Sequence, residues 1–171
     1  MEIIRKRAYA RAGLLGNPSD GYNGKTISFS VGNFWAEVVL YVWDSVEIVL
    51  AENDRNRFRS VQDLAIDVQM HGYYGGIRLI KATIKRFVEY CNGEGIQLHN
   101  RNFSVRYETN IPQQVGLAGS SGIIVATLRC LMDFYGVEIP LNIQPSLMLS
   151  VETEELGITA GLQDRVIQCY E

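Results

Sequence analysis

A glycine- and serine-rich stretch in the second half of the sequence has the composition of an anion-binding loop. This glycine loop, residues 112–122, follows a segment that reads as a strand and precedes one that reads as a helix. Glycines let backbone N–H groups approach a ligand, and a helix start adds unpaired N–H groups and a partial positive charge. Ser120 and Ser121 add hydroxyl groups suited to a phosphate or a magnesium ion. We therefore expect the loop to hold a polyphosphate.

The glycine loop matches neither of two common nucleotide-binding motifs. No lysine follows its second glycine as in a Walker P-loop, and its glycines do not have the spacing of the dinucleotide-binding fingerprint. Taken alone, the stretch is also typical of a structural turn with a serine as the helix N-cap. The loop by itself therefore leaves both interpretations open.

Two further segments carry the charged groups that phosphoryl transfer requires. Arg11 leads into a polar turn that ends at Asp20, and Glu152 lies in an acidic stretch that leads to Asp164. Singly, the first is typical of a strand and a turn, and the second of a solvated helix face. A small-molecule kinase needs a phosphate cradle, a carboxylate for a metal ion and a charged group at the attacking hydroxyl. The three segments together predict that chemistry.

In this order, the three segments resemble the motifs of the GHMP small-molecule kinases, which include galactokinase and the homoserine, mevalonate and phosphomevalonate kinases. The first family motif resembles residues 8–16, the second resembles residues 112–121, and the segment with the catalytic aspartate resembles residues 161–164. Within the family, the plant-type glucuronokinases resemble the chain over nearly its whole length, most clearly at residues 7–11, 13–20, 30–36, 72–76 and 156–165.

The resemblance implies phosphoryl transfer from MgATP to the anomeric hydroxyl of D-glucuronate, a sugar-1-kinase reaction that would serve UDP-glucuronate salvage. It implies metal ligation by Ser120 or Ser121 and by a helix glutamate. We favour Glu152 over Glu154 and Glu155, although one residue more or less turns a helix face by about 100°. The implied nucleotide-binding residues are Pro112, Gln113, Gln114, Val115, Gly116, Leu117, Ala118, Gly119, Ser120 and Ser121.

The resemblance also implies roles for the groups around the acceptor sugar. Asp164 would take or orient the proton of the sugar hydroxyl. Arg11 would keep Asp164 ionised and stabilise charge on the transferred phosphoryl group. Asp20 matches a sugar-binding position of galactokinase, and we expect Asn17, in the same turn, to contact the substrate as well.

Other residues are weaker candidates for the site. A uronate carboxylate needs a cation, and Lys25 and Arg165 are candidates on charge alone. Trp35 and Trp43 could line an adenine pocket, although packing is the commoner role of such residues. We expect structural or surface roles for the remaining candidates, Tyr73, Tyr74, His71 and His99.

The elements that must position these residues read as strands first and helices afterwards. Period-two alternation and β-branched or aromatic runs predict a small antiparallel sheet over residues 3–4, 9–12, 26–31, 34–42 and 46–50, with a returning strand over 103–107. A charged loop follows at residues 52–60. Apolar spacing predicts helices over 61–68, from 77 to about 92–93, from 123 to 136, over 146–156 and from 161. This order predicts the α+β class. The resemblance implies the GHMP kinase N-terminal domain, a ribosomal protein S5 domain 2-like fold.

The composition is that of an ordinary globular chain and excludes several functions. The 171 residues, 47% hydrophobic and 20% charged, suffice for one domain with a buried core. A net charge of −3 provides no basic field for nucleic acid. No apolar run approaches the roughly 20 residues of a membrane span. The cysteines, 3 in number, are too few for a disulfide framework and fit a reduced, cytoplasmic protein.

Family members usually have a second domain with a third glycine-rich motif. The sequence ends at Glu171, shortly after Asp164, without that motif. We therefore expect residues 1–171 to be the N-terminal, ATP-binding domain of such a kinase, with the C-terminal domain missing. Two alternatives to an active glucuronate kinase stay open: an inactive relic that still binds nucleotide, and a GHMP kinase for another sugar, such as galactose or a heptose phosphate.

Overall fold

A four-stranded mixed sheet forms one layer of the molecule. The computed structural model describes residues 3–51 and 75–171. The strands follow the order β1-β2-β4-β3 across the sheet. β1 and β2 are antiparallel, β2 and β4 are antiparallel, and β3 is parallel to β4. The strands are β1 (Ile3–Leu15), β2 (Ile27–Trp43), β3 (Glu47–Ile48) and β4 (Asn102–Thr109).

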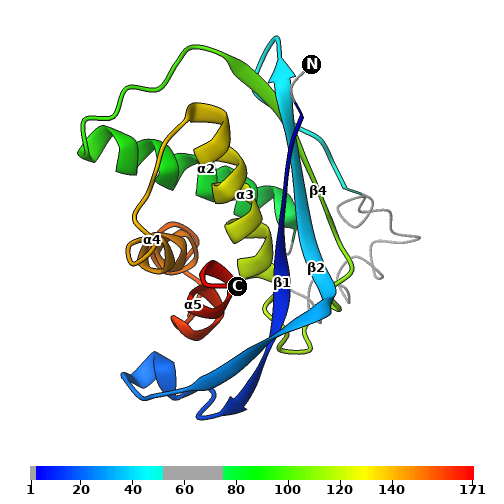
Figure 1. Cartoon of the computed structure of the whole chain (residues 1–171), viewed down its shortest axis with the longest axis vertical. Helices are drawn as coiled ribbons and strands as arrows, with labels where there is room; N and C mark the ends of the chain where they lie inside the picture. Colours follow the sequence, from blue (N-terminus) through cyan, green and yellow to red (C-terminus); the bar gives the residue numbers. More distant parts are fainter. Residues whose placement is uncertain (1–2, 52–74) are drawn as a thin grey trace, which may run out of the picture.

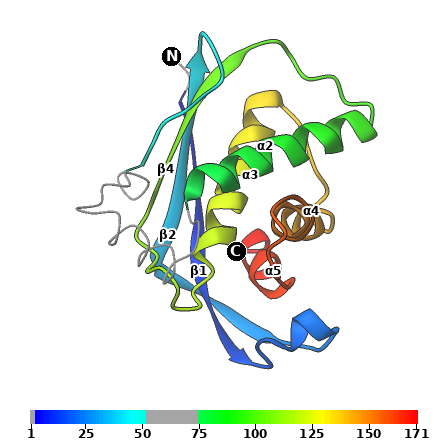
Figure 2. The ribbon, with the colours of Figure 1, turned by 180° about the vertical axis from the view of Figure 1, so that it is seen from behind.

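The helices form a second layer on one face of this sheet, as both views of the ribbon show (Figures 1 and 2). They are η1 (Ser19–Tyr22), α2 (Gly76–Gly93), α3 (Gly119–Tyr135), α4 (Gln144–Ser150), the π-helix η3 (Val151–Glu155) and α5 (Gln163–Cys169). α3 is buried along most of its length and packs against β1, β2 and α2. None of the described helices has the length and apolar character that a membrane crossing requires. The predicted α+β class is confirmed.

β1 and β2 are each longer than the sequence predicts, because their pairing continues across the predicted breaks. Tyr9 pairs with Trp35, whereas Ala10 pairs with Val31, so β2 accommodates extra residues at that point. The predicted break in β2, between residues 31 and 34, lies at this irregularity, whereas the predicted break in β1, between residues 4 and 9, lies where the pairing is regular. A bulge interrupts the alternation of side chains without ending the strand.

The prediction of an antiparallel sheet is wrong for β3. Ile48 pairs with Val105 in the parallel direction, and β4 lies between β2 and β3. The predicted loop over 52–60 and helix over 61–68, together with His71, Tyr73 and Tyr74, lie outside the described residues.

Two helices end where the sequence predicts, each beside a glycine in a left-handed conformation. α3 ends before Gly136, which has a φ of 64°, as predicted. α2 ends at Gly93, as predicted, and Gly95, with a φ of 70°, is the left-handed residue that closes it. Ile96 N–H donates to the Cys91 carbonyl at 2.8 Å, and Gly95 N–H donates to the Asn92 carbonyl at 3.2 Å. This bonding pattern is a Schellman motif.

The segment predicted as one helix over 146–156 contains two kinds of helix. α4 begins at Gln144 and passes into the π-helix η3, which ends at Glu155. The Ile158 N–H then donates to the Glu152 carbonyl at 2.7 Å and turns the chain toward α5. α5 begins at Gln163 rather than at Gly161.

Candidate active site

The glycine loop presents backbone N–H groups without acceptors. Three of its residues have left-handed backbone conformations, with φ values of 59° at Gln114, 73° at Gly116 and 62° at Ala118. Ala118 directly precedes α3, and no side chain caps the helix, so the interpretation with a serine N-cap is wrong. Among residues 3–51 and 75–171, no acceptor is bonded to the N–H groups of Gly119 or Ser120. These donors and the partial positive charge of the helix are therefore available to an anion.

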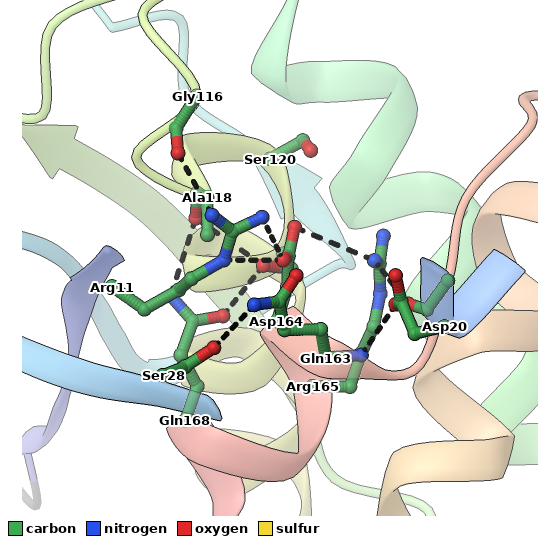
Figure 3. Close-up of polar contacts among 12 residues, drawn as sticks. Arg11, Asp20, Ser28, Gly116, Ala118, Ser120, Gln163, Asp164, Arg165 and Gln168 are labelled. Carbon is green, nitrogen blue, oxygen red and sulfur yellow. Dashed lines mark hydrogen bonds and ion pairs between the residues drawn. The ribbon is translucent and has the colours of Figure 1, made fainter. Parts of the chain in front are cut away.

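Arg11 joins the glycine loop to α5. Its Nε donates to Asp164 Oδ1 at 2.5 Å, and a second guanidinium nitrogen pairs with the same oxygen. Its Nη1 donates to the Gly116 carbonyl at 3.0 Å, and its backbone N–H donates to the Leu117 carbonyl at 3.3 Å (Figure 3). Only 7% of the Arg11 surface is exposed. β1, the glycine loop and α5 thus meet at one buried guanidinium group.

Two effects act in opposite directions on the Asp164 carboxyl. Burial raises its pKa above the ordinary value, and the Arg11 guanidinium lowers it by charge and by hydrogen bonding. The nearby Asp20 carboxylate adds a smaller upward shift, and the net pKa is raised. Arg11 therefore favours the ionised form, as expected, but does not outweigh burial. A raised pKa makes Asp164 a stronger base than an exposed aspartate.

Asp20 lies beside the start of α5, although the two are far apart in the sequence. Its Oδ2 accepts the Gln163 N–H at 2.9 Å. Gly161 permits this approach, because a Cβ there would lie 2.1 Å from Asp20 Oδ2. The turn that carries Asp20 also places Asn17 beside Gly13, where a Cβ would lie 3.1 Å from that of Asn17. The structure therefore brings the predicted sugar-binding turn to the helix of Asp164.

An open groove of about 590 Å³ extends from Asp20 along α5. Sequence reasoning missed three of the polar residues that line it, Asn23, Ser28 and Gln163. Gln163 Nε2 donates to Ser28 Oγ (Figure 3). Gln163 lies inside a motif that the sequence analysis singled out, and Ser28 lies in a predicted strand, but only the β1–β2 pairing and the docking of α5 bring them together. The remaining lining residues are Asp20, Gly24, Thr26, Ile27, Leu162, Val166, Ile167 and Tyr170.

Of the three glutamates considered for a metal ion, the structure brings only Glu152 to the loop serines. Ser120 Oγ donates to Glu152 Oε1 at 2.8 Å, and Glu152 is 2% exposed. Glu154 instead accepts from Arg86 at 2.9 Å, and Glu155 accepts from Lys85 at 2.5 Å. Both cations belong to α2, so Glu154 and Glu155 are held against that helix.

The two serines of the loop have different surroundings. Ser121 is fully buried, and its hydroxyl donates to Gln168 Oε1 at 2.5 Å. Ser120 is partly exposed and contacts Glu152. Of the two serines that the resemblance offers as metal ligands, the structure therefore brings Ser120 to the Glu152 carboxylate and Ser121 to Gln168.

Arg165 cannot serve as the free cation for a uronate carboxylate, and that expectation is wrong. It is 2% exposed, its guanidinium pairs with Glu152, and its Nη1 donates to the Gly161 carbonyl at 2.8 Å. Burial lowers its pKa to about 10. Lys25 is exposed and lies between two residues that line the groove, Gly24 and Thr26.

The two tryptophans do not form one pocket. Trp35 lies at the base of the glycine loop, where its backbone N–H donates to Asn110 Oδ1 at 2.7 Å. The Arg7 guanidinium carbon lies 4.3 Å from the centre of the Trp35 ring. Trp43 pairs with Asn102 at the opposite end of β4. His99 Nε2 lies 2.8 Å from the Phe134 carbonyl, in the structural role that was predicted for it.

A family model for the N-terminal domain of GHMP kinases matches residues 78–171. The chain belongs to the GHMP kinase family. This GHMP kinase chain is 50% identical over 171 residues to a protein of Arabidopsis thaliana named probable glucuronokinase 2, and the match covers 98% of the chain and 46% of that protein. It is 51% identical over 172 residues to glucuronokinase 1 of the same plant, covering 98% of the chain and 47% of that protein.

A solved structure shares the fold of this GHMP kinase chain. The phosphomevalonate kinase of Streptococcus pneumoniae superposes with a TM-score of 0.74 at 16% sequence identity, covering 100% of the chain and 47% of that protein. At this identity the likeness concerns the fold alone. The chain spans about half the length of the curated relatives it matches, at 46% and 47%.

Proposed function

We propose that residues 1–171 form the ATP-binding domain of an enzyme that transfers a phosphoryl group from MgATP to the anomeric hydroxyl of D-glucuronate. The observation that carries the proposal is the contact of Arg11 with both Asp164 and the Gly116 carbonyl, because it puts a half-buried carboxylate beside the phosphate cradle. The choice of D-glucuronate is supported by the 50% and 51% identity to proteins named as glucuronokinases.

In this proposal, the glycine loop holds the triphosphate. The free N–H groups of Gly119 and Ser120 and the partial charge of the α3 N-terminus bind the phosphate oxygens. Arg11, anchored to Gly116, supplies a fixed positive charge toward the transferred group. Such preorganised charge stabilises the transition state of phosphoryl transfer, in which negative charge spreads over the phosphoryl oxygens.

Asp164 acts on the acceptor. The sugar lies in the groove, and Asp20 accepts one of its hydroxyl groups. Asp164 accepts the proton of the anomeric hydroxyl while the hydroxyl oxygen forms a bond to the γ-phosphorus. The bond between that phosphorus and the β,γ-bridging oxygen breaks, and ADP leaves. The raised pKa of Asp164 suits this role, because a stronger base takes the proton more readily.

Ser120 and Glu152 would hold the magnesium ion. A hydroxyl and a carboxylate oxygen 2.8 Å apart are a donor set that Mg²⁺ accepts. Mg²⁺ commonly takes only one or two protein ligands and completes its coordination with phosphates and water. Two ligands agree with the described residues, among which no three or more metal-binding side chains cluster. When bound, the ion would neutralise phosphate charge. Lys25 stays the candidate for the uronate carboxylate.

We also propose that this enzyme acts in the cytoplasm. Cys91, Cys130 and Cys169 are all buried and unpaired, which suits a reducing environment.

A turnover assay with a substrate panel tests the proposal. The chain is incubated with ATP, Mg²⁺ and D-glucuronate, galactose or a heptose phosphate, and ADP release is measured. We expect release with D-glucuronate above that with the other sugars, and a loss of about 10²- to 10⁴-fold in Asp164→Asn. The matched control is Asp133→Asn, which removes a half-exposed carboxylate that pairs with Lys6 outside the site. Equal rates in wild type and Asp164→Asn would refute catalysis by this chain.

A second candidate function is nucleotide binding without catalysis. The observation that favours it is the glycine loop, whose free N–H groups at Gly119 and Ser120 can bind phosphates without an acceptor sugar. Stabilisation by MgATP without any turnover would support this candidate over the first.

A further inference from the structure

One buried amide of α5 has no part in the proposed chemistry, yet it joins that helix to the glycine loop. Gln168 is fully buried and lies one helical turn after Asp164. Residues four apart in an α-helix lie on the same face. The face of α5 that brings Asp164 to Arg11 therefore also carries Gln168.

Both ends of the Gln168 amide are used, and they reach three different elements (Figure 3). Its Nε2 donates to the Tyr9 carbonyl of β1 at 2.7 Å and to the Ala118 carbonyl at 3.2 Å. Its Oε1 accepts from the Ser121 hydroxyl of α3 at 2.5 Å. A glutamine amide has two N–H donors and one carbonyl acceptor. No shorter or apolar side chain can make these three bonds.

The bond to Ala118 acts where the backbone needs support. Ala118 has a φ of 62°, a left-handed conformation that is unfavourable for a residue with a Cβ. The peptide that follows it carries the N–H of Gly119, which belongs to the phosphate cradle. The fit is close, because a Cβ on Gly122 would lie 3.4 Å from Gln168 Nε2. The amide thus holds the conformation from which the cradle begins.

We propose that Gln168 is a positioning residue that locks α5 and the glycine loop into one unit. The lock keeps the N–H groups of Gly119 and Ser120 at a fixed separation from the Asp164 carboxylate. The inference rests on the proposed function, since it is there that these groups hold nucleotide and acceptor. The inference does not depend on which sugar is bound or on the rate of turnover.

The test compares Gln168→Met with Thr83→Val. Methionine keeps the length of the side chain but makes none of the three hydrogen bonds. Thr83 is equally buried, and its hydroxyl donates to the Leu79 carbonyl at 2.7 Å within α2, an element that contributes nothing to the cradle. Hydrogen exchange of the Arg11 and Gly122 amides, which donate to the Leu117 and Ala118 carbonyls of the loop, is measured by NMR without ligand, at a temperature where both variants are folded. Affinity for MgATP is measured by calorimetry.

We expect exchange of the Arg11 and Gly122 amides to be at least tenfold faster in Gln168→Met than in wild type, and MgATP affinity to fall about tenfold. Thr83→Val lowers the melting temperature but changes neither quantity. Unchanged exchange in Gln168→Met, or an equal change in Thr83→Val, overturns the inference. If the wild-type chain binds no MgATP, the proposed function fails, while the exchange comparison still decides the role of Gln168.

Ser121→Ala provides a milder form of the same test. It removes one bond of Gln168 and leaves the other two, so the folded state is less affected. We expect exchange of the Arg11 and Gly122 amides to rise by a smaller factor than in Gln168→Met. In the double variant the rise should fall well below the product of the two single rises, because the Ser121–Gln168 bond is already lost in Gln168→Met and only the 3.2 Å contact of the Ser121 hydroxyl with the Ala118 carbonyl is left to remove. Independent, multiplying effects of the two changes would contradict a shared lock.

Discussion

At the residue scale, the Arg11 side chain places a positive charge between Asp164 and the glycine loop. It contacts the Asp164 carboxylate and the Gly116 carbonyl from a position that is 7% exposed. A buried ion pair is a poor source of stability, because both charges lose their hydration. Its value here is geometric, since it holds a base beside the cradle.

Removing the Arg11 charge should raise the pKa of Asp164 further. Burial already raises that pKa, and Arg11 is the group that opposes the rise. In Arg11→Met we therefore expect the Asp164 carboxyl, followed by ¹³C NMR, to titrate at a higher pH than in wild type. A group with a raised pKa in the folded state stabilises the fold below its unfolded pKa of about 4 and loses that contribution as pH rises. The loss of stability above that pH should be larger in Arg11→Met, and an unchanged or lower pKa would contradict the assignment.

Residue types identified the charged groups of the site but not their partners. Arg11, Asp20 and Asp164 were named from the sequence, and the structure brings them together. Which of Glu152, Glu154 and Glu155 faces the glycine loop depends on the π-helix η3, because its wider turn changes the direction of each side chain. No local sequence pattern reveals a π-helix. The burial of Ser121 and Arg165 also depends on contacts between elements distant in the sequence, so neither could be predicted.

At the scale of the element, glycines determine where helices end. The Asn92–Gly93 pair reads as a helix end in the sequence, but the left-handed residue is Gly95. Both glycines have open space around the position of a Cβ, so only the backbone distinguishes them.

Two alanine substitutions should therefore have opposite effects. Gly93→Ala places alanine at the end of a helix and should stabilise by up to about 0.5 kcal/mol. Gly95→Ala forces a Cβ into a left-handed conformation and should destabilise by about 1 kcal/mol. Urea unfolding measures both. The same sign for the two variants would show that α2 does not end as described.

Gly161 should affect the sugar rather than the fold. A Cβ there would lie 2.1 Å from Asp20 Oδ2, and that carboxylate is the end of a side chain that can move aside. We expect Gly161→Ala to displace Asp20 from the Gln163 N–H and to weaken sugar binding, with nucleotide affinity retained. Gly32→Ala is the matched control, because nothing lies within 4 Å of its Cβ position. Calorimetry with each ligand separates the two affinities, and equal sugar affinity in both variants would contradict a role for Asp20.

The sheet shows the limit of local patterns most clearly. Alternation identified the strands, including the one over 103–107, because alternation is a local property. The parallel pairing of β3 with β4 is set by where the chain returns, and β4 lies between β2 and β3. Strand order and direction therefore had to come from the structure.

At the scale of the whole molecule, the site collects residues from both ends of the chain. β1, the turn before β2, the start of α3 and α5 meet at one end of the sheet, on the side that carries the helices (Figure 1). A ligand bound there would connect elements that are distant in the sequence, and should therefore stabilise the whole fold.

MgATP should raise the melting temperature of the chain. At about 100 times its dissociation constant, a ligand contributes about 2.7 kcal/mol. For a chain of this size that corresponds to a rise of about 5–10 °C. Asp164→Asn should show a similar rise, because Asp164 faces the acceptor rather than the phosphates. No rise in wild type would contradict nucleotide binding, and a rise lost in Asp164→Asn would contradict its placement.

A crystal structure of the chain with a non-hydrolysable MgATP analogue and D-glucuronate tests the central claim most directly. The distance to measure joins the anomeric hydroxyl oxygen to the nearer carboxylate oxygen of Asp164. The account predicts a distance of about 2.6–3.2 Å, with the phosphates bound to the N–H groups of Gly119 and Ser120. A sugar bound beyond the reach of that carboxylate, or phosphates bound away from the glycine loop, would contradict it.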